Sequence, residues 1–163
     1  MVPAGKTVLP SVWAMTRKRR ITTREVYKWK ARLNVDGSKK FAGRDFGEIY
    51  SPVASWDSIR MLLIMAISRG WHTRQLDYVM AYPQAPFERD TYMSIPKGYK
   101  LSHGDPKDFV FKIHKNIYGL RQAGQVWNQY LVANLKKIGF VQIQIDPCVF
   151  WQGNTLYTLY TDD

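Results

Sequence analysis

Two strand-like segments of this chain end in acidic residues, and this feature constrains its fold more than any other. Residues 73–77 read as a strand that ends in Asp77, and residues 156–160 lead to the pair Asp162 and Asp163. A fold that brings both strand ends together gathers three carboxylates, as a two-metal phosphoryl-transfer site requires. The alternative is that these acids occupy ordinary solvated turns or caps, where most such residues lie.

The segment before the C-terminal acids has the pattern of a β-hairpin. Residues 149–151 and 156–160 are rich in aromatic and β-branched side chains, as strands are. Gln152-Gly153-Asn154 lies between them and contains the Gly and Asn that suit a tight turn. We therefore expect the acidic pair at the far end of the second strand of a hairpin.

Positive charge is concentrated near the N-terminus. The net charge is +11, and residues 1–44 contain 12 Lys or Arg against two acids, whereas residues 45–163 contain 12 against 11. A one-sided basic region of this kind is typical of proteins that bind phosphate backbones. A solubilising tail or a nuclear-targeting run at residues 17–20 would have the same composition, so charge alone leaves these alternatives open.

Periodicity favours a folded basic element over a tail. Residues 12–15 and 25–33 read as strands, joined through residues 16–24. Two sets of side chains alternate along the second strand, Val26, Lys28, Lys30 and Arg32 in one and Tyr27, Trp29, Ala31 and Leu33 in the other. Three cations would therefore share one face of a hairpin and could lie over phosphates, while the aromatic face packs or stacks.

A helical pattern follows, and two short strands come after it. The apolar stripe from residue 59 to residue 67 has the spacing of an amphipathic helix, with Ser55 as its N-cap and Gly70 as its end. We expect this helix to pack behind the sheet and assign it no catalytic part. Residues 91–95 and 109–113 read as strands, because they alternate and are bounded by turn-forming residues.

A second helix is predicted after Gly119-Leu120, ending at Gly139. One apolar face of this helix would be formed by Trp127, Tyr130, Leu131, Leu135 and Ile138. Arg121 and Gln122 would lie at its start, where a helix N-terminus and a cation together favour a phosphate. An ordinary pair of helix-opening residues is the alternative.

Composition narrows the class of protein. The chain has 45% apolar residues and 163 residues in all, enough to bury a core, and no run approaches the roughly 18 apolar residues of a membrane span. Its single cysteine, Cys148, excludes an internal disulfide and fits a reducing compartment. The first residues lack the apolar segment of a signal peptide. We expect an α+β protein that does not associate with membranes.

Seven segments resemble, in the same order, the landmarks of reverse transcriptases from copia-type retrotransposons. They are Lys30-Ala31-Arg32-Leu33, Tyr50-Ser51-Pro52-Val53, Gln75-Leu76-Asp77, residues 92–99, residues 118–123, Asp146-Pro147-Cys148 and Tyr160-Thr161-Asp162-Asp163. The resemblance implies an RNA-directed DNA polymerase with fingers and a partial palm, in which helices back an antiparallel sheet that is truncated at the catalytic hairpin. It implies a basic fingers hairpin region in residues 1–54, and a palm core with interleaved fingers elements in residues 55–163, without a thumb or a ribonuclease H domain.

The resemblance also implies roles for individual residues. Asp77, Asp162 and Asp163 would hold two Mg²⁺ ions, for which Mn²⁺ can substitute, and would catalyse the transfer of a deoxynucleotide to a primer 3′-hydroxyl. The residues implied to contact the deoxynucleoside triphosphate are Lys30, Arg32, Tyr78, Tyr82 and Gln122, and those implied to contact nucleic acid are Lys18, Lys28, Arg121 and Tyr160. Tyr82 would crowd a 2′-hydroxyl. The chain departs from retroviral enzymes at Met80, where those usually have a second acid, and Pro83 is a further departure.

The implied partners are an RNA template, a DNA primer, deoxynucleoside triphosphates and the rest of a Pol polyprotein, with no membrane. The implied location is the cytoplasm, inside a virus-like particle, or the nucleus. The alternatives are a non-catalytic basic nucleic-acid-binding module that depends on residues 1–44, or the remnant of an element. Because the return strand of the catalytic hairpin would begin past residue 163, we expect the 163-residue chain by itself to be inactive as a polymerase.

Overall fold

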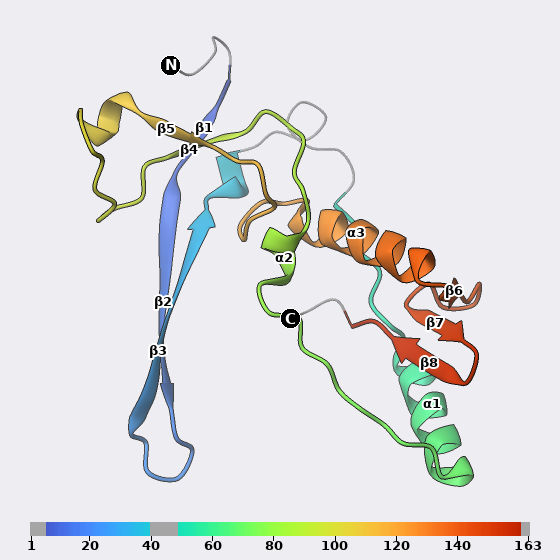
Figure 1. Ribbon diagram of the computed structural model, residues 1–163. Helices are drawn as coiled ribbons and strands as arrows, with labels where there is room; N and C mark the ends of the chain where they lie inside the picture. The colour runs from blue at the N-terminus through green and yellow to red at the C-terminus, as the bar shows by residue number, and fades with distance from the viewer. Residues whose placement is uncertain (1–5, 40–48, 161–163) are drawn as a thin grey trace. The chain divides into compact units, whose positions relative to one another are not determined.

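A long β-hairpin is the most prominent element of the computed structural model, which describes residues 6–39 and 49–160 (Figure 1). The chain divides into two units, one made of Met1–Gly47 and Pro86–Ala123 and the other of Glu48–Ala85 and Gly124–Asp163. Each unit is described by itself below. The subdomain division between residues 54 and 55 stays a prediction. No helix in the described ranges is long and apolar enough to cross a membrane.

The hairpin of the first unit pairs β2 (Ser11–Arg19) with β3 (Val26–Val35) in antiparallel register. The predicted hairpin is thus confirmed, but the expectation that β2 ends at residue 15 and that residues 16–24 only connect the strands is wrong. Pairing continues to the partners Arg17↔Trp29 and Lys18↔Lys28, and Arg20 N–H donates to the Glu25 carbonyl at 2.9 Å across the turn. Solvent screens the repulsion between the exposed cations, so it does not prevent the backbone pairing.

A small sheet anchors the base of this hairpin. In it β1 (Val8–Leu9) pairs in parallel with β4 (Tyr92–Ser94), which pairs antiparallel with β5 (Val110–Lys112). The strands predicted at residues 91–95 and 109–113 are confirmed, each one residue shorter at both ends. Ser11 N–H donates to the Ser94 hydroxyl at 2.9 Å, and Trp13 Nε1 donates to the Lys97 carbonyl at 3.0 Å. Two short 3₁₀ turns, η1 (Gly37–Lys39) and η2 (Pro106–Asp108), complete the unit.

The second unit contains the helices and a second antiparallel sheet. Helix α1 (Trp56–Arg69) begins and ends as predicted, because the Ser55 hydroxyl accepts a hydrogen bond from Ser58 N–H and Gly70 forms the C-cap. A single turn, α2 (Ala81–Gln84), precedes the long α3 (Ala123–Lys137), most of which lies in this unit. The sheet consists of β6 (Val141–Gln142), β7 (Val149–Gln152) and β8 (Thr155–Thr158), with the predicted hairpin between the last two.

The core of the second unit lies between α3 and this sheet. Three residues one helical turn apart on α3, Trp127, Leu131 and Leu135, are buried against Cys148, Phe150 and Leu159. The predicted apolar face of the helix is therefore correct at its centre. Tyr130 and Ile138 lie outside it, with 37% and 63% of their surfaces exposed.

The strand predicted at residues 73–77 is absent from the structure. Residues 71–77 are exposed and have no regular secondary structure, and Leu76, which should face a core in a palm strand, is 66% exposed. A strand requires a neighbouring backbone to pair with and a face to bury, and no described segment offers either to these residues. The described strands form three small sheets, so the fold is of the expected α+β class, while its finer palm architecture stays a prediction.

Candidate nucleotide-binding pocket and catalytic segments

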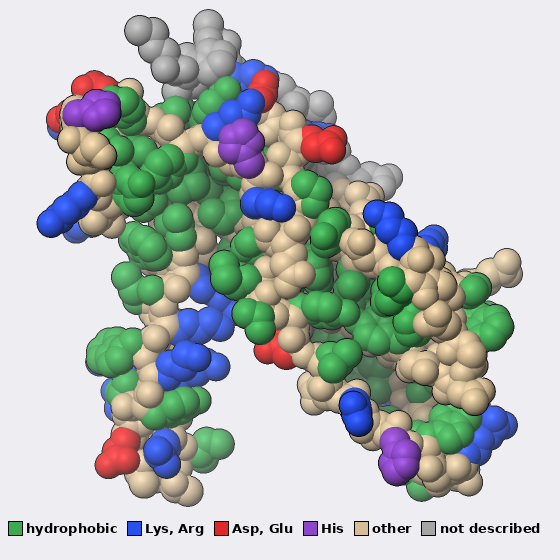
Figure 2. Space-filling view, viewed as in Figure 1, with side chains coloured by type: hydrophobic (Ala, Val, Ile, Leu, Met, Phe, Trp, Pro, Cys, Tyr) green, Lys and Arg blue, Asp and Glu red, His purple; other side chains and the backbone are tan. Residues whose placement is uncertain are grey.

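One face of the β2–β3 hairpin carries four cations, three of which the alternation along the second strand predicted there. Lys18 pairs with Lys28, Thr16 with Lys30, and Ala14 with Arg32 in the cross-strand register. Directly paired residues point to the same side of a sheet, so the four cations form one continuous basic face. Cationic side chains are exposed along the hairpin in Figure 2. The grouping of Lys18 with the other three follows from a strand that is longer than predicted.

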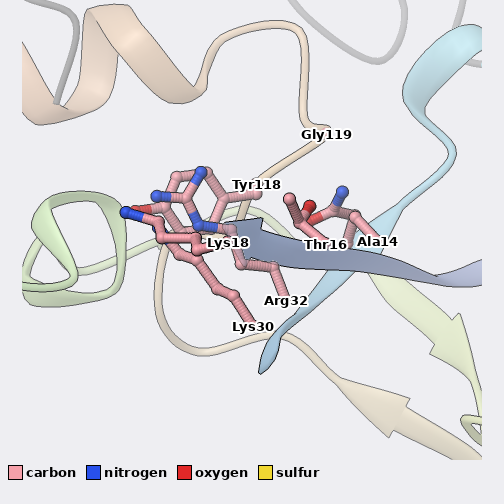
Figure 3. Close-up of a pocket in the computed structure, with 8 residues that line it drawn as sticks. Ala14, Thr16, Lys18, Lys30, Arg32, Tyr118 and Gly119 are labelled. Carbon is pink, nitrogen blue, oxygen red and sulfur yellow. The ribbon is translucent and has the colours of Figure 1, made fainter. Parts of the chain in front are cut away.

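The basic face forms one wall of a cavity of about 450 Å³ in the first unit. Tyr118 and Gly119 supply the opposing wall, from the loop that precedes α3. Figure 3 shows Lys18, Lys30 and Arg32 on the same side of the hairpin as the Tyr118 ring. Among the described residues, no carboxylate lies within ion-pair distance of Lys18 or Lys30. Such a cavity has a positive potential and room for a polyphosphate.

Tyr118 and Gly119 lie beside the hairpin because the two backbones touch. Val35 N–H donates to the Tyr118 carbonyl at 2.9 Å. Gly119 has a φ of 91°, and a Cβ at this position would overlap the carbonyl oxygen of Val35. Only glycine satisfies both conditions without strain, since a left-handed backbone already disfavours other residues. The end of β3 is thereby fixed against the loop that closes the pocket.

Arg32 and Tyr118 are held together by a cation–π contact. The Arg32 guanidinium lies 4.8 Å from the centroid of the Tyr118 ring, and both side chains are half-buried. Partial desolvation strengthens such a contact, which contributes about 1–2 kcal/mol. The ring therefore orients the guanidinium within the pocket.

Two polar residues of the pocket, Thr16 and Asn34, were not predicted from the sequence. Both line the cavity from the basic face, and the Asn34 Oδ1 atom is buried without a hydrogen-bond partner among the described residues. Continuing the alternation by one more step beyond Arg32 would have placed Asn34 on this face. An unsatisfied buried acceptor is costly, so its position in the wall favours a ligand or water that donates to it.

Arg121 and Gln122 lie in a turn before α3, since the helix begins at Ala123 and not directly after Leu120. Arg121 donates from Nε to the Gly37 carbonyl at 3.3 Å and from Nη2 to the Ser38 carbonyl at 3.5 Å, which holds η1 against this turn. Gln122 is only 4% exposed, and neither its amide oxygen nor its amide nitrogen has a hydrogen-bond partner in the described part of the chain. Their predicted contacts with phosphate and nucleotide stay predictions.

The residues after Asp77 are attached to the core of the second unit. Tyr78 shares a hydrogen bond of 3.0 Å with the Tyr157 hydroxyl, and its ring packs edge-on against Trp127 at 5.3 Å. Burial, and then the Tyr78 hydroxyl, raise the pKa of Tyr157 above its ordinary value. Asp77 itself is exposed. The side chain of Tyr78 thus serves packing, and a nucleotide contact at this position would use its backbone N–H.

Tyr82 and Met80 belong to the turn that follows. Tyr82 is half-buried against the core from α2, and Met80 has a left-handed backbone with φ 52° and ψ 48°. The Gln84 side chain donates to the Val79 carbonyl at 2.8 Å and closes this turn. A left-handed conformation is uncommon for a residue other than glycine and marks a local strain directly after the Asp77 segment.

Asp162 and Asp163 lie outside the described residues, so their predicted arrangement with Asp77 stays a prediction. Within residues 6–39 and 49–160, no cluster of three or more His, Cys, Asp or Glu side chains is placed to hold a metal ion. Tyr160, which precedes the pair, is 51% exposed. As a donor set, three carboxylates suit magnesium, which prefers oxygen ligands and retains several waters.

Asp146 is a structural residue whose role the sequence did not reveal. The residue is 6% exposed, and its carboxylate accepts hydrogen bonds from Ser55 N–H at 3.0 Å and Cys148 N–H at 2.9 Å. Burial alone would raise the pKa of Asp146, but hydrogen bonds from the Ser58 hydroxyl, from Cys148 N–H and from Ser55 lower it below its ordinary value. The sequence Asp146-Pro147-Cys148 could have predicted the hydrogen bond from Cys148 N–H, because an Asp side chain often accepts from the N–H two residues later.

Comparisons with known proteins agree with the resemblance seen in the sequence. A family model described as "Reverse transcriptase (RNA-dependent DNA polymerase)" matches residues 1–163. The chain is 36% identical to the Retrovirus-related Pol polyprotein from transposon RE1 of Arabidopsis thaliana and 33% identical to that from transposon TNT 1-94 of Nicotiana tabacum. In each case 99% of the chain is matched, but only 11% and 12% of the relative. The yeast Transposon Ty1-BL Gag-Pol polyprotein is 26% identical over 97% of the chain and 8% of its own length. No solved structure matches.

Proposed function

Because the chain belongs to the reverse transcriptase (RNA-dependent DNA polymerase) family of copia-type Pol polyproteins, we propose that it forms the fingers and part of the palm of an RNA-directed DNA polymerase. The chain spans about an eighth or less of the relatives it matches, so the remainder of a Pol polyprotein would be its covalent partner. Its substrates would be an RNA template, a DNA primer and deoxynucleoside triphosphates.

The observation that supports this proposal most directly is the basic pocket of the first unit. Lys30 and Arg32 lie in the wall of a cavity of about 450 Å³, and Tyr118 holds the guanidinium of Arg32 in place. A triphosphate bound here would have its charge offset by these two residues and by Lys18. Asn34 adds a buried amide oxygen to the pocket wall, and the described residues leave this atom unpaired.

The proposed catalytic residues are Asp77, Asp162 and Asp163, whose carboxylates would hold two magnesium ions. When bound, the ions lower the pKa of the primer hydroxyl and stabilise the leaving pyrophosphate. The backbone N–H of Tyr78 would contact the triphosphate, and the Tyr82 ring would exclude a 2′-hydroxyl. No protein nucleophile is required, because the primer hydroxyl attacks the α-phosphorus directly.

Other residues would position the nucleic acid. Lys28 continues the basic face beyond the pocket, where it would contact the template backbone. Arg121 would help to position the nucleic acid through the turn that it holds against η1. Tyr160 is exposed and lies two residues before Asp162 in the sequence, so it would contact nucleic acid near the proposed acids. Gln122 would pack against the nascent base pair.

The test is primer extension on an RNA template by the parent Pol polyprotein that carries this chain. We expect Asp77→Asn and Asp162→Asn to abolish extension, since each removes a charged metal ligand. Asp57→Asn is the matched control, because the Asp57 side chain is 97% exposed on α1 and makes only a weak ion pair at 3.9 Å. Extension by all the variants at the parent's rate would refute the proposed site.

A second candidate function is a basic nucleic-acid-binding module without catalysis. It is favoured by one observation: the basic pocket and hairpin lie in a unit that does not contain Asp77. The same experiment separates the two functions. A module would bind template equally well with Asp77→Asn and would never extend a primer, whereas the polymerase loses extension and keeps binding.

A further inference from the structure

Gly124, the second residue of α3, lies beside the hydroxyl end of the Tyr82 side chain. A Cβ at residue 124 would be 3.8 Å from the Tyr82 hydroxyl oxygen and 3.7 Å from the Cβ of Ser51. All three residues belong to the second unit. Both distances are ordinary van der Waals contacts, so a single methyl group fits between Ser51 and the Tyr82 hydroxyl.

The backbone does not require glycine at this position. Gly124 lies inside α3 and does not have the positive φ of Gly119 or Gly139. Glycine is also less favourable than alanine within a helix. The feature that sets residue 124 apart is therefore the space beside it, into which the Tyr82 hydroxyl and Ser51 both face.

Buried polar atoms without partners lie in the same region. The Ser51 Oγ atom is buried, and no described residue forms a hydrogen bond with it. Asn128 follows Gly124 by one turn on the same face of α3, is 8% exposed, and its Nδ2 atom has no partner within the described ranges. The hydroxyl end of Tyr82 thus lies near polar groups, while its ring packs against the apolar core.

We propose that Gly124 and Ser51 are positioning residues for sugar discrimination, and that the size of the side chain at residue 124 determines where the Tyr82 ring lies. The inference rests on the proposed function, in which the Tyr82 ring excludes a 2′-hydroxyl. The ring is attached to the single turn α2, and its far end lies beside α3. A larger side chain at residue 124 would displace that end, and about 1 Å of displacement at a positioned group can change a rate on the order of a hundredfold.

The experiment measures single-nucleotide primer extension on an RNA template by the parent Pol polyprotein, with dCTP or CTP opposite a template guanine. The quantity compared is the ratio of kcat/KM for dCTP to kcat/KM for CTP. Gly124→Val adds two branches, each about 1.5 Å beyond the Cβ, and the stiff χ1 of valine limits their escape. Gly124→Ala adds only the methyl group that fits. Ala133→Val is the matched control, because Ala133 is exposed on the same helix.

We expect Gly124→Val to lower the ratio at least about tenfold, because a displaced ring fits deoxyribose less well and leaves room for a 2′-hydroxyl. Gly124→Ala and Ala133→Val should keep the ratio within about twofold of the parent's. Tyr82→Phe keeps the ring but removes the hydroxyl nearest to Gly124. Gly124→Val should therefore change the ratio much less in a Tyr82→Phe background than alone.

Circular dichroism of the 163-residue chain shows whether each variant folds. If Gly124→Val does not fold, Gly124→Ser takes its place under the same criteria, because serine adds one atom beyond the Cβ and valine adds two. A purely structural role of Gly124 would lower extension with dCTP and CTP equally and would leave their ratio unchanged.

Three outcomes would overturn the inference: an unchanged ratio in Gly124→Val, an equal change in Ala133→Val, or an undiminished effect of Gly124→Val in the Tyr82→Phe background. Each of them is observed with a parent that extends primers, so each leaves the polymerase proposal intact. A parent that extends no primer would refute the polymerase proposal and this inference with it.

Discussion

Substitution of Gly119 tests how the pocket wall is held in place. Gly119 has a φ of 91°, and a Cβ there would overlap the Val35 carbonyl. Gly98 is the matched control, because its φ is 88° in the same unit and a Cβ there would meet nothing within 4 Å. Alanine at either position carries the cost of a left-handed backbone, about 1–2 kcal/mol. Only Gly119→Ala must also move the backbone, which adds about 1–3 kcal/mol.

We therefore expect Gly98→Ala to lower the free energy of unfolding by about 1–2 kcal/mol and Gly119→Ala by about 2–5 kcal/mol. Urea denaturation followed by circular dichroism measures both values. Gly119→Ala should also weaken the binding of inorganic triphosphate, measured by calorimetry, because Tyr118 moves with its neighbour and releases Arg32. Gly98→Ala should leave that binding unchanged. Equal destabilisation by the two variants would refute the close contact between Gly119 and Val35 as the source of the effect.

Two further predictions concern the core of the second unit. Asp146→Asn should lower the free energy of unfolding by about 2–4 kcal/mol at neutral pH, because it weakens charged hydrogen bonds to Ser55 and Cys148. The pKa of Asp146 is lowered in the folded state, so the parent's larger free energy of unfolding should be fully present above about pH 4. This difference from Asp146→Asn should be lost as the pH falls through the folded pKa. A pH-independent difference in urea denaturation would contradict this. Burial, and then the charge of Asp146, raise the pKa of Cys148 to about 11. Iodoacetamide at pH 8 should therefore modify the Cys148 thiol only after the chain unfolds. Rapid labelling of the folded chain, detected by mass spectrometry, would contradict this expectation.

The local features of the fold were predictable from the sequence because short-range physics determines them. The period-two alternation from residue 26 to residue 33 placed Lys28, Lys30 and Arg32 on one face, since adjacent strand residues point to opposite sides. Ser55 and Gly70 marked the ends of α1, because the cap hydrogen bond and the left-handed terminal residue are local.

The features that were not predicted depend on contacts between distant segments. Residues 73–77 were predicted to form a strand, but strand formation requires a pairing partner that the sequence of one segment cannot specify. The two-residue strands β1 and β6 exist only because a neighbour pairs with them. Tyr118 reaches the pocket through a bond to Val35, and no spacing in the sequence indicates that meeting.

The hydrogen bonds around Asp146 connect three parts of the second unit that are remote in the sequence. The carboxylate accepts from Ser55 N–H at the start of α1 and from Cys148 N–H before β7, while the Cys148 carbonyl accepts from Leu159 N–H at 2.7 Å. Leu159 is 2% exposed and directly precedes Tyr160, so the backbone leaves the core from a fixed point. A displacement of about 1 Å at a catalytic group can reduce the rate on the order of a hundredfold. Under the proposed function, the buried Asp146 carboxylate therefore links the start of α1 to the position of Leu159, from which the chain continues toward Asp162.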